Sequence, residues 1–237
     1  MRNNYFLFIT SILLTLILTS NSYCQSSEST EKGTRTIYLI RHGYYNESDE
    51  RDEFIGKGLT PLGIAQARLI SARLKGMSVH FTSLVSSTMT RARETAMVIN
   101  EDFPELQLTQ NELICECTPP SWRKDVMAGV DTVHRKECVE KLEKAFKEYF
   151  IPSPDKNDRN DLIVCHGNVI RYFVTKVLKV DKMSWLQMSI GNCSLTVIRI
   201  KSDGSMKLVS FSDVGHIPPN MQTETGGNND LKELIIH

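Results

Sequence analysis

Hydrophobic side chains follow two patterns along the chain: short continuous runs, and longer stretches with helical spacing. Residues 36–40 form a short β-branched, aromatic and aliphatic run, which is typical of a strand covered on both faces. Similar runs at 79–85 and 161–165 predict two more strands. Each run leads into polar residues, so we expect these strands to deliver polar side chains to loops.

Helical spacing fills the intervals between these runs. Thr60 followed by Pro61 is typical of a helix start, and apolar residues then recur at helical spacing until Gly76. Another helix is expected after residue 165, where Asn168 can cap its amino end. Two further helices are predicted over residues 89–100 and 131–150.

Near the carboxyl end, the pattern predicts a β-hairpin. Residues 195–200 and 206–211 flank Asp203-Gly204, a strong signal for a tight turn. Strands that alternate with helices predict an α/β fold, here a three-layer sandwich with a mostly parallel sheet and helices on both faces. The hairpin should add antiparallel strands at one edge of this sheet.

The amino-terminal residues are typical of a targeting segment. Arg2 precedes a largely apolar stretch over residues 5–18, which is shorter than the roughly 18–20 residues that a spanning helix needs. We therefore expect residues 1–24 to be a cleavable signal peptide, with a membrane anchor as the alternative. The remaining boundaries are a linker over 25–35, a single domain over 36–223 and a polar tail over 224–237.

Charge and cysteine content narrow the possible partners and cofactors. Lys and Arg number 28 and Asp and Glu also number 28, so no net charge favours nucleic acid, and we expect no nucleic-acid partner. Of six cysteines, Cys24 lies at the edge of the targeting segment, and the other five cannot all pair within one chain. The sequence contains no C-x-x-C pair, the spacing that would suggest a zinc site. We expect the cysteines of the folded domain to be buried free thiols.

The first candidate chemistry lies where the run at 36–40 ends. Arg41 carries a guanidinium fork, which suits the paired acceptors of a phosphate, and the adjacent His42 imidazole can act as a nucleophile near neutral pH. The alternative is that both residues only pair with nearby carboxylates such as Glu47 or Asp49.

Two later segments favour the phosphate interpretation. The run at 161–165 delivers His166 to a second strand end, followed by a predicted helix whose backbone N–H groups favour anions. Arg91 lies on the first turn of the helix that follows the strand at 79–85. Its side chain should point at the crevice where the ends of these strands meet. Arg93 instead fits a solvated, salt-bridged helix face.

Four ordered motifs are similar to those of the histidine phosphatase superfamily, also called the phosphoglycerate mutase-like family. They are Leu39-Ile40-Arg41-His42-Gly43, Leu59-Thr60-Pro61-Leu62-Gly63 with Gln66-Ala67, Ser86-Ser87 through Thr90-Arg91-Ala92-Arg93-Glu94-Thr95, and Cys165-His166-Gly167. Within the family, segments 86–92, 166–173 and 215–219 most resemble a branch of mitochondrial serine/threonine protein phosphatases. The resemblance spans roughly residues 36–223.

The resemblance implies roles for individual residues. His42 would be the nucleophile, Arg41 and Arg91 would bind the phosphoryl oxygens, and His166 would complete the pocket. The family also uses an acidic residue after the third strand as general acid. Glu116 fits that position because apolar neighbours could raise its pKa, and Glu112 is the competitor. No metal or cofactor is implied.

The resemblance also implies a substrate class and partners. We expect hydrolysis of phosphoserine and phosphothreonine in proteins; the alternatives are a small-metabolite phosphatase or mutase of the same fold, or a non-catalytic scaffold. Tyr44 after Gly43 and the lack of a clear substrate-enclosing insertion favour hydrolysis over mutase transfer. The expected partners are a phosphorylated protein, a mitochondrial membrane contacted by the amino terminus and a second copy of the chain, whereas a cleaved signal peptide would indicate the secretory pathway.

Overall fold

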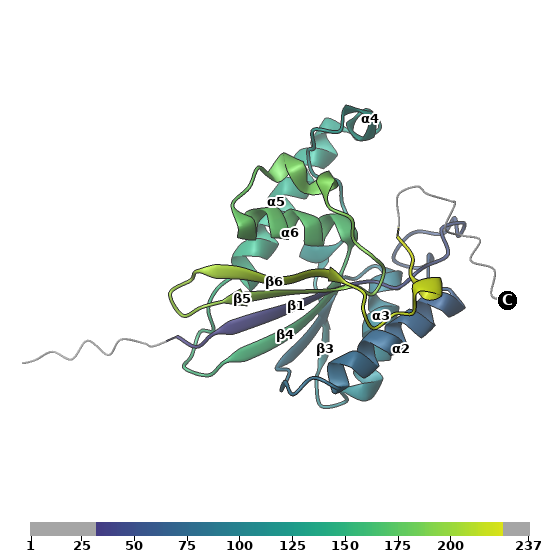
Figure 1. Cartoon of the computed structure of the whole chain (residues 1–237). Helices are drawn as coiled ribbons and strands as arrows, with labels where there is room; N and C mark the ends of the chain where they lie inside the picture. The colour runs from purple at the N-terminus through teal and green to yellow at the C-terminus, as the bar shows by residue number, and fades with distance from the viewer. Residues whose placement is uncertain (1–31, 225–237) are drawn as a thin grey trace, which may run out of the picture. The chain divides into compact units, whose positions relative to one another are not determined.

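The computed structural model describes residues 32–224, and these contain a single six-stranded sheet with helices on both faces (Figure 1). The strands are β1 (Arg35–Arg41), β2 (Ser83–Ser86), β3 (Leu108–Gln110), β4 (Arg159–Cys165), β5 (Leu195–Ile200) and β6 (Met206–Asp213). The α-helices are α2 (Pro61–Lys75), α3 (Thr90–Asp102), α4 (Lys124–Met127), α5 (Thr132–Tyr149) and α6 (Gly167–Leu178). Short 3-10 helices are η1 (Glu112–Ile114), η2 (Lys182–Gln187) and η3 (Pro219–Met221).

The sheet order is β3-β2-β4-β1-β5-β6, and its first four strands are parallel. Strand β5 pairs antiparallel with β1 and β6 pairs antiparallel with β5, so the expected hairpin lies at one edge. The α/β sandwich expected from the sequence is therefore confirmed. The parallel strands bring their carboxyl ends to the same side of the sheet.

Side chains of β1 alternate between two hydrophobic cores. Ile37 and Leu39 belong to the core beneath α5 and α6, whereas Tyr38 and Ile40 pack on the side of α2 and α3 (Figure 1). All seven residues of β1 are buried. Burial on both faces accounts for the unbroken hydrophobic run in the sequence, because neither face of the strand meets water.

Helix starts largely follow their sequence signals. Thr60 caps α2 by accepting a hydrogen bond from the Gly63 backbone N–H, and Pro61 is the first helical residue. Asp131 caps α5 in the same way. Asn168 does not cap α6, because His166 is the N-cap residue and Asn168 lies inside the first turn, where its amide donates to the Cys117 carbonyl.

One strand prediction was wrong in extent, and one strand was missed. The run at 79–85 forms a strand only from Ser83, because Val79 and Phe81 reach the core without joining a ladder. Strand β3 was not predicted, since it has three residues of which only Leu108 is apolar.

Part of the sequence prediction concerns residues beyond the described range. The targeting segment, most of the linker and the tail from residue 225 lie outside residues 32–224. Within that range, no helix is both long enough and apolar enough to cross a membrane.

Candidate active site

The register of β1 and β4 brings the two candidate histidines together. Arg41 pairs with Cys165 across the parallel ladder, so His42 and His166 follow at equivalent positions. Their rings lie 5.1 Å apart between centroids, and both side chains are buried. Adjacent strand ends therefore create an imidazole pair at the carboxyl edge of the sheet.

A hydrogen bond fixes the tautomer of His42. Its Nδ1 lies 2.8 Å from the Gly43 carbonyl oxygen, which can only accept, so Nδ1 carries the proton and Nε2 presents a lone pair. Burial lowers the pKa of His42 well below its ordinary value, and the charges of Arg41 and Arg91 lower it further. The ring is consequently neutral and nucleophilic at Nε2.

Arg91 directs its guanidinium at this lone pair. Its Nε donates to His42 Nε2 over 3.3 Å, and its guanidinium lies over the Tyr45 ring at 4.8 Å. An ion pair with Glu53 at 3.0 Å occupies another of its nitrogens. Arg91 is only 3% exposed although it belongs to the first turn of α3, so its charge is directed inward.

Arg93 departs from its expected role. It donates to the main-chain oxygens of Thr88 and Phe54, and no ion pair is found for it within residues 32–224. The prediction that Arg93 forms an exposed salt bridge is therefore wrong. Its guanidinium instead hydrogen-bonds to the backbone of loops next to the start of α3.

Arg41 lies at the end of β1 and is 2% exposed. It donates to the Ile190 carbonyl, and burial lowers the pKa of its guanidinium to about 10, so it stays charged at neutral pH. The carboxylates offered as its alternative partners lie elsewhere, since Asp49 pairs with Arg51 and Glu47 is exposed. A fixed cation therefore flanks the histidine pair.

His166 is held by a serine that the sequence analysis did not single out. Its Nε2 lies 2.8 Å from the Ser87 hydroxyl, while its Nδ1 has no hydrogen-bond partner among the described residues. Burial lowers the pKa of His166, and the nearby His42, Arg91 and Arg41 add to this effect. His166 is therefore a neutral group with one free ring nitrogen.

Asn192 is a second supporting residue that the sequence analysis missed. Its side-chain amide donates to the His42 carbonyl over 3.0 Å, and it is buried. A polar residue just before the apolar β5 is the only local signal. Which segment it contacts could not be inferred without the fold.

Two glycines let residues 42–44, which follow β1 and which we call the histidine loop, pack against α2. A Cβ atom on Gly43 would lie 2.6 Å from the Gly63 carbonyl oxygen, and one on Gly63 would lie 1.9 Å from the Tyr44 carbonyl oxygen. Neither contact is possible for a real side chain, so the two backbones approach closely only because both residues are glycine. The second motif therefore supports the first.

The two candidate acids lie in different surroundings. The Oε1 atom of Glu116 is buried without a hydrogen-bond partner among the described residues, whereas Glu112 is exposed on η1. Burial raises the pKa of Glu116, and the charges of Arg91, Arg41 and Arg171 oppose that rise. Of the two candidate acids, Glu116 is thus the one within the electrostatic reach of the arginines.

The cysteine prediction was wrong for one pair. Cys117 and Cys138 form a disulfide, with 5.7 Å between their Cα atoms, while Cys115, Cys165 and Cys193 are free and buried. An odd number of cysteines excludes complete pairing but not a single bond. Cys117 and Cys138 lie on separate segments, and only the fold brings them together.

Comparisons with known proteins agree with this geometry. The sequence profile described as histidine phosphatase superfamily (branch 1) matches residues 37–149 and 134–213. The chain belongs to the histidine phosphatase superfamily. The matched region includes the ends of β1 and β4, and so covers His42 and His166.

Curated relatives and a solved structure extend the family assignment. The chain is 40% identical to "Serine/threonine-protein phosphatase Pgam5, mitochondrial" of Caenorhabditis elegans, over 81% of this chain and 68% of the relative. It is 32% identical to the human PGAM5 phosphatase, over 82% and 68%. It is also similar to the crystal structure of phosphoglycerate mutase from Plasmodium falciparum, at 27% identity with a TM-score of 0.55, covering 78% of this chain and 95% of that one.

Proposed function

We propose that this histidine phosphatase hydrolyses phosphoserine and phosphothreonine in proteins through a phosphohistidine on His42. The observation that carries the proposal is the contact of 3.3 Å between Arg91 Nε and the unprotonated Nε2 of His42. When a phosphate oxygen accepts the Arg91 hydrogen bond in place of His42 Nε2, the cation binds the phosphate and the lone pair of Nε2 is left to attack phosphorus.

In the first step, Nε2 of His42 forms a bond to phosphorus as the bond to the substrate oxygen breaks. Arg41 and Arg91 stabilise the charge on the transferred group, and the free ring nitrogen of His166 donates to one of its oxygens. In this tautomer the other ring nitrogen, Nε2, accepts from the Ser87 hydroxyl, which lies 2.8 Å away. The positive charge at the site comes from Arg41 and Arg91.

Glu116 acts in both steps. Its protonated carboxyl gives its proton to the departing serine or threonine oxygen, and the resulting carboxylate then takes a proton from water. The hydroxide formed in this way attacks the phosphohistidine and releases inorganic phosphate. The raised pKa of Glu116 supports this role, because a buried carboxyl keeps its proton at a higher pH than an exposed one.

The substrate class is supported by the relatives, whose names describe serine/threonine-protein phosphatases. The likeness to a phosphoglycerate mutase keeps a small-metabolite phosphatase or mutase as the second candidate. Turnover of phosphoserine and phosphothreonine peptides should exceed that of 3-phosphoglycerate and sugar phosphates, with His42→Ala as the blank. A preference for phosphoglycerate would favour the second candidate, and no turnover at all would favour a non-catalytic scaffold.

The same relatives are named as mitochondrial, and this supports a mitochondrial location for the chain. We propose membrane association through the amino terminus and assembly of at least a dimer as accompanying properties. Subcellular fractionation of the tagged protein, sequencing of its natural amino terminus and analytical ultracentrifugation would test these three points. A processed amino terminus on a secreted form would favour the signal-peptide alternative.

A further inference from the structure

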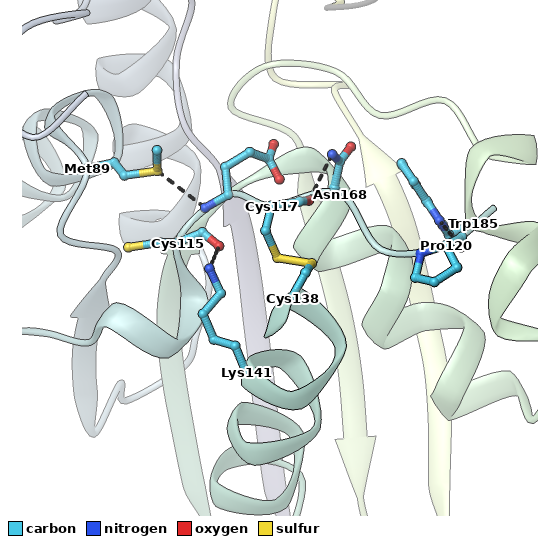
Figure 2. The surroundings of a disulfide bond; sticks show 9 residues. Met89, Cys115, Cys117, Pro120, Cys138, Lys141, Asn168 and Trp185 are labelled. Carbon is cyan, nitrogen blue, oxygen red and sulfur yellow. Dashed lines mark hydrogen bonds between the residues drawn. A yellow bond between two sulfur atoms is a disulfide. The ribbon is translucent and has the colours of Figure 1, made fainter. Parts of the chain in front are cut away.

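Glu116 lies on an irregular stretch of chain, residues 115–120, which we call the acid segment. The segment belongs to no helix or strand. Lys141 donates to the Cys115 carbonyl over 2.9 Å, Asn168 donates to the Cys117 carbonyl over 3.0 Å, and Trp185 donates to the Pro120 carbonyl over 2.9 Å (Figure 2). Contacts from other elements therefore set its path.

A covalent bond joins the acid segment to α5. Cys117, the residue after Glu116, is bonded to Cys138, which is 3% exposed and packs in the core beneath α5 and α6 (Figure 2). Because Cys138 belongs to an 18-residue helix with a buried face, it provides a fixed anchor. The bond is one residue away from the carboxyl that must meet the leaving group.

The carboxyl group of Glu116 has little else to hold it. Its Oε1 is buried without a partner among the described residues, and its backbone N–H contacts only the weak acceptor Met89 Sδ at 3.3 Å. The Asn168 backbone N–H also stabilises the charged form of this carboxyl, whereas attraction to the surrounding guanidinium groups is not directional. The position of the carboxyl therefore depends on this one contact and on the backbone on either side of it, and the disulfide constrains that backbone.

We propose that the Cys117–Cys138 disulfide positions Glu116 for proton transfer, so that its reduction selectively weakens the step that needs the acid. The inference rests on the proposed function. A dithiol supplies two electrons and two protons; the S–S bond breaks, Cys117 and Cys138 become thiols, and the dithiol becomes a disulfide. Reduction leaves His42, Arg91 and His166 in place and keeps the hydrogen bonds to the acid segment, but it removes the covalent anchor next to Glu116.

Leaving-group dependence separates positioning from general damage. The ratio kcat/KM reports phosphoryl transfer to His42, and an alkoxide leaving group needs a proton whereas p-nitrophenolate does not. In Cys138→Ser we expect kcat/KM for a phosphoserine peptide to fall at least about tenfold, and that for p-nitrophenyl phosphate by less than about threefold. Wild type treated with dithiothreitol should show the same difference, with two more thiols per chain.

Three variants control the experiment. Glu137→Ser changes the exposed neighbour on the same helix and should keep both kcat/KM values and the response to dithiothreitol. Cys138→Ser should no longer respond to dithiothreitol. Glu116→Gln should show the same substrate difference, which establishes that the assay detects the acid.

Equal losses on both substrates, or no loss on either, would overturn the positioning role. If Cys138→Ser does not fold, reduced and oxidised wild type give the comparison, and unfolding on reduction would appear as equal losses. A substrate difference in Glu116→Gln but not in Cys138→Ser would reject the disulfide inference while leaving the proposed function intact. Wild-type turnover in His42→Ala would reject the function itself.

Discussion

The pKa values of the two candidate catalytic groups shift in the directions that their proposed roles require. Burial, together with the charges of Arg41 and Arg91, lowers the pKa of His42, and burial raises the pKa of Glu116 against the opposing effect of the arginines. A neutral base beside a protonated acid is the combination that phosphoryl transfer to an imidazole needs. Environment thus lets two unlike residues act in one pH range.

This arrangement predicts a specific pH dependence. Protonation of His42 should cause the acid limb of kcat/KM, and loss of the proton of Glu116 should cause the alkaline limb. In Glu116→Gln we expect kcat/KM for a phosphoserine peptide to fall about 10²- to 10⁴-fold and the alkaline limb to disappear. The titration of the substrate phosphate is the same for both enzymes and cancels in the comparison.

Glu112→Gln provides the matched control, because Glu112 is the exposed carboxyl closest in sequence to the candidate acid. Its pH profile should superimpose on that of the wild type. Persistence of the alkaline limb in Glu116→Gln, or its loss in Glu112→Gln, would assign the acid to another residue.

At this scale the sequence predicted residue identities better than residue contacts. His42, His166, Arg41 and Arg91 could be nominated because their types match phosphate chemistry and their motifs match a family. Ser87 lies in one of the motifs but its role could not be assigned, and Asn192 lies in none, because each supports a histidine from a segment far away in the chain. Such contacts depend on the register of distant strands.

At the scale of the elements, the contact between the amino end of α2 and the histidine loop leaves no room for a side chain at Gly63. A Cβ on Gly63 would lie 1.9 Å from the Tyr44 carbonyl oxygen, which is part of the backbone and cannot rotate away. We expect Gly63→Ala to lower the free energy of unfolding by about 3 kcal/mol, at the upper end of overpacking costs. Urea denaturation followed by circular dichroism measures this change.

Gly129→Ala is the matched control, since a Cβ there would meet nothing within 4 Å. Its free energy of unfolding should stay within about 0.5 kcal/mol of the wild type, as is usual for surface substitutions. Equal stability of the two variants would mean that the loop moves aside freely, and that the close approach of Gly43 and Gly63 does not shape the site.

Long, periodic elements were predictable, whereas short and irregular ones were not. Helices α2 and α5 have caps and regular apolar faces, and β1 and β4 have unbroken hydrophobic runs. Strand β3 and the acid segment lack such signals, because pairing and side-chain contacts from other elements define them. The disulfide belongs to this second group, since Cys117 lies on the acid segment and Cys138 on α5, and only the tertiary structure brings them together.

For the folded region as a whole, the sheet topology brings the candidate catalytic residues together. Parallel pairing of β1, β4 and β2 brings three strand ends to one edge, and these carry His42, His166 and the loop leading to Arg91. Residues more than 120 positions apart in the sequence thereby lie in one candidate phosphate site. The family assignment and the geometry lead to the same interpretation of that site.

The central claim is that this site forms a covalent bond to phosphorus through His42. Rapid quenching of the enzyme with a ³²P-labelled phosphoserine peptide, followed by mapping of the label, tests the claim directly. We expect an acid-labile phosphoenzyme with the label on His42 in the wild type, and no labelled enzyme in His42→Ala. Label on another residue, or wild-type turnover in His42→Ala, would contradict the account.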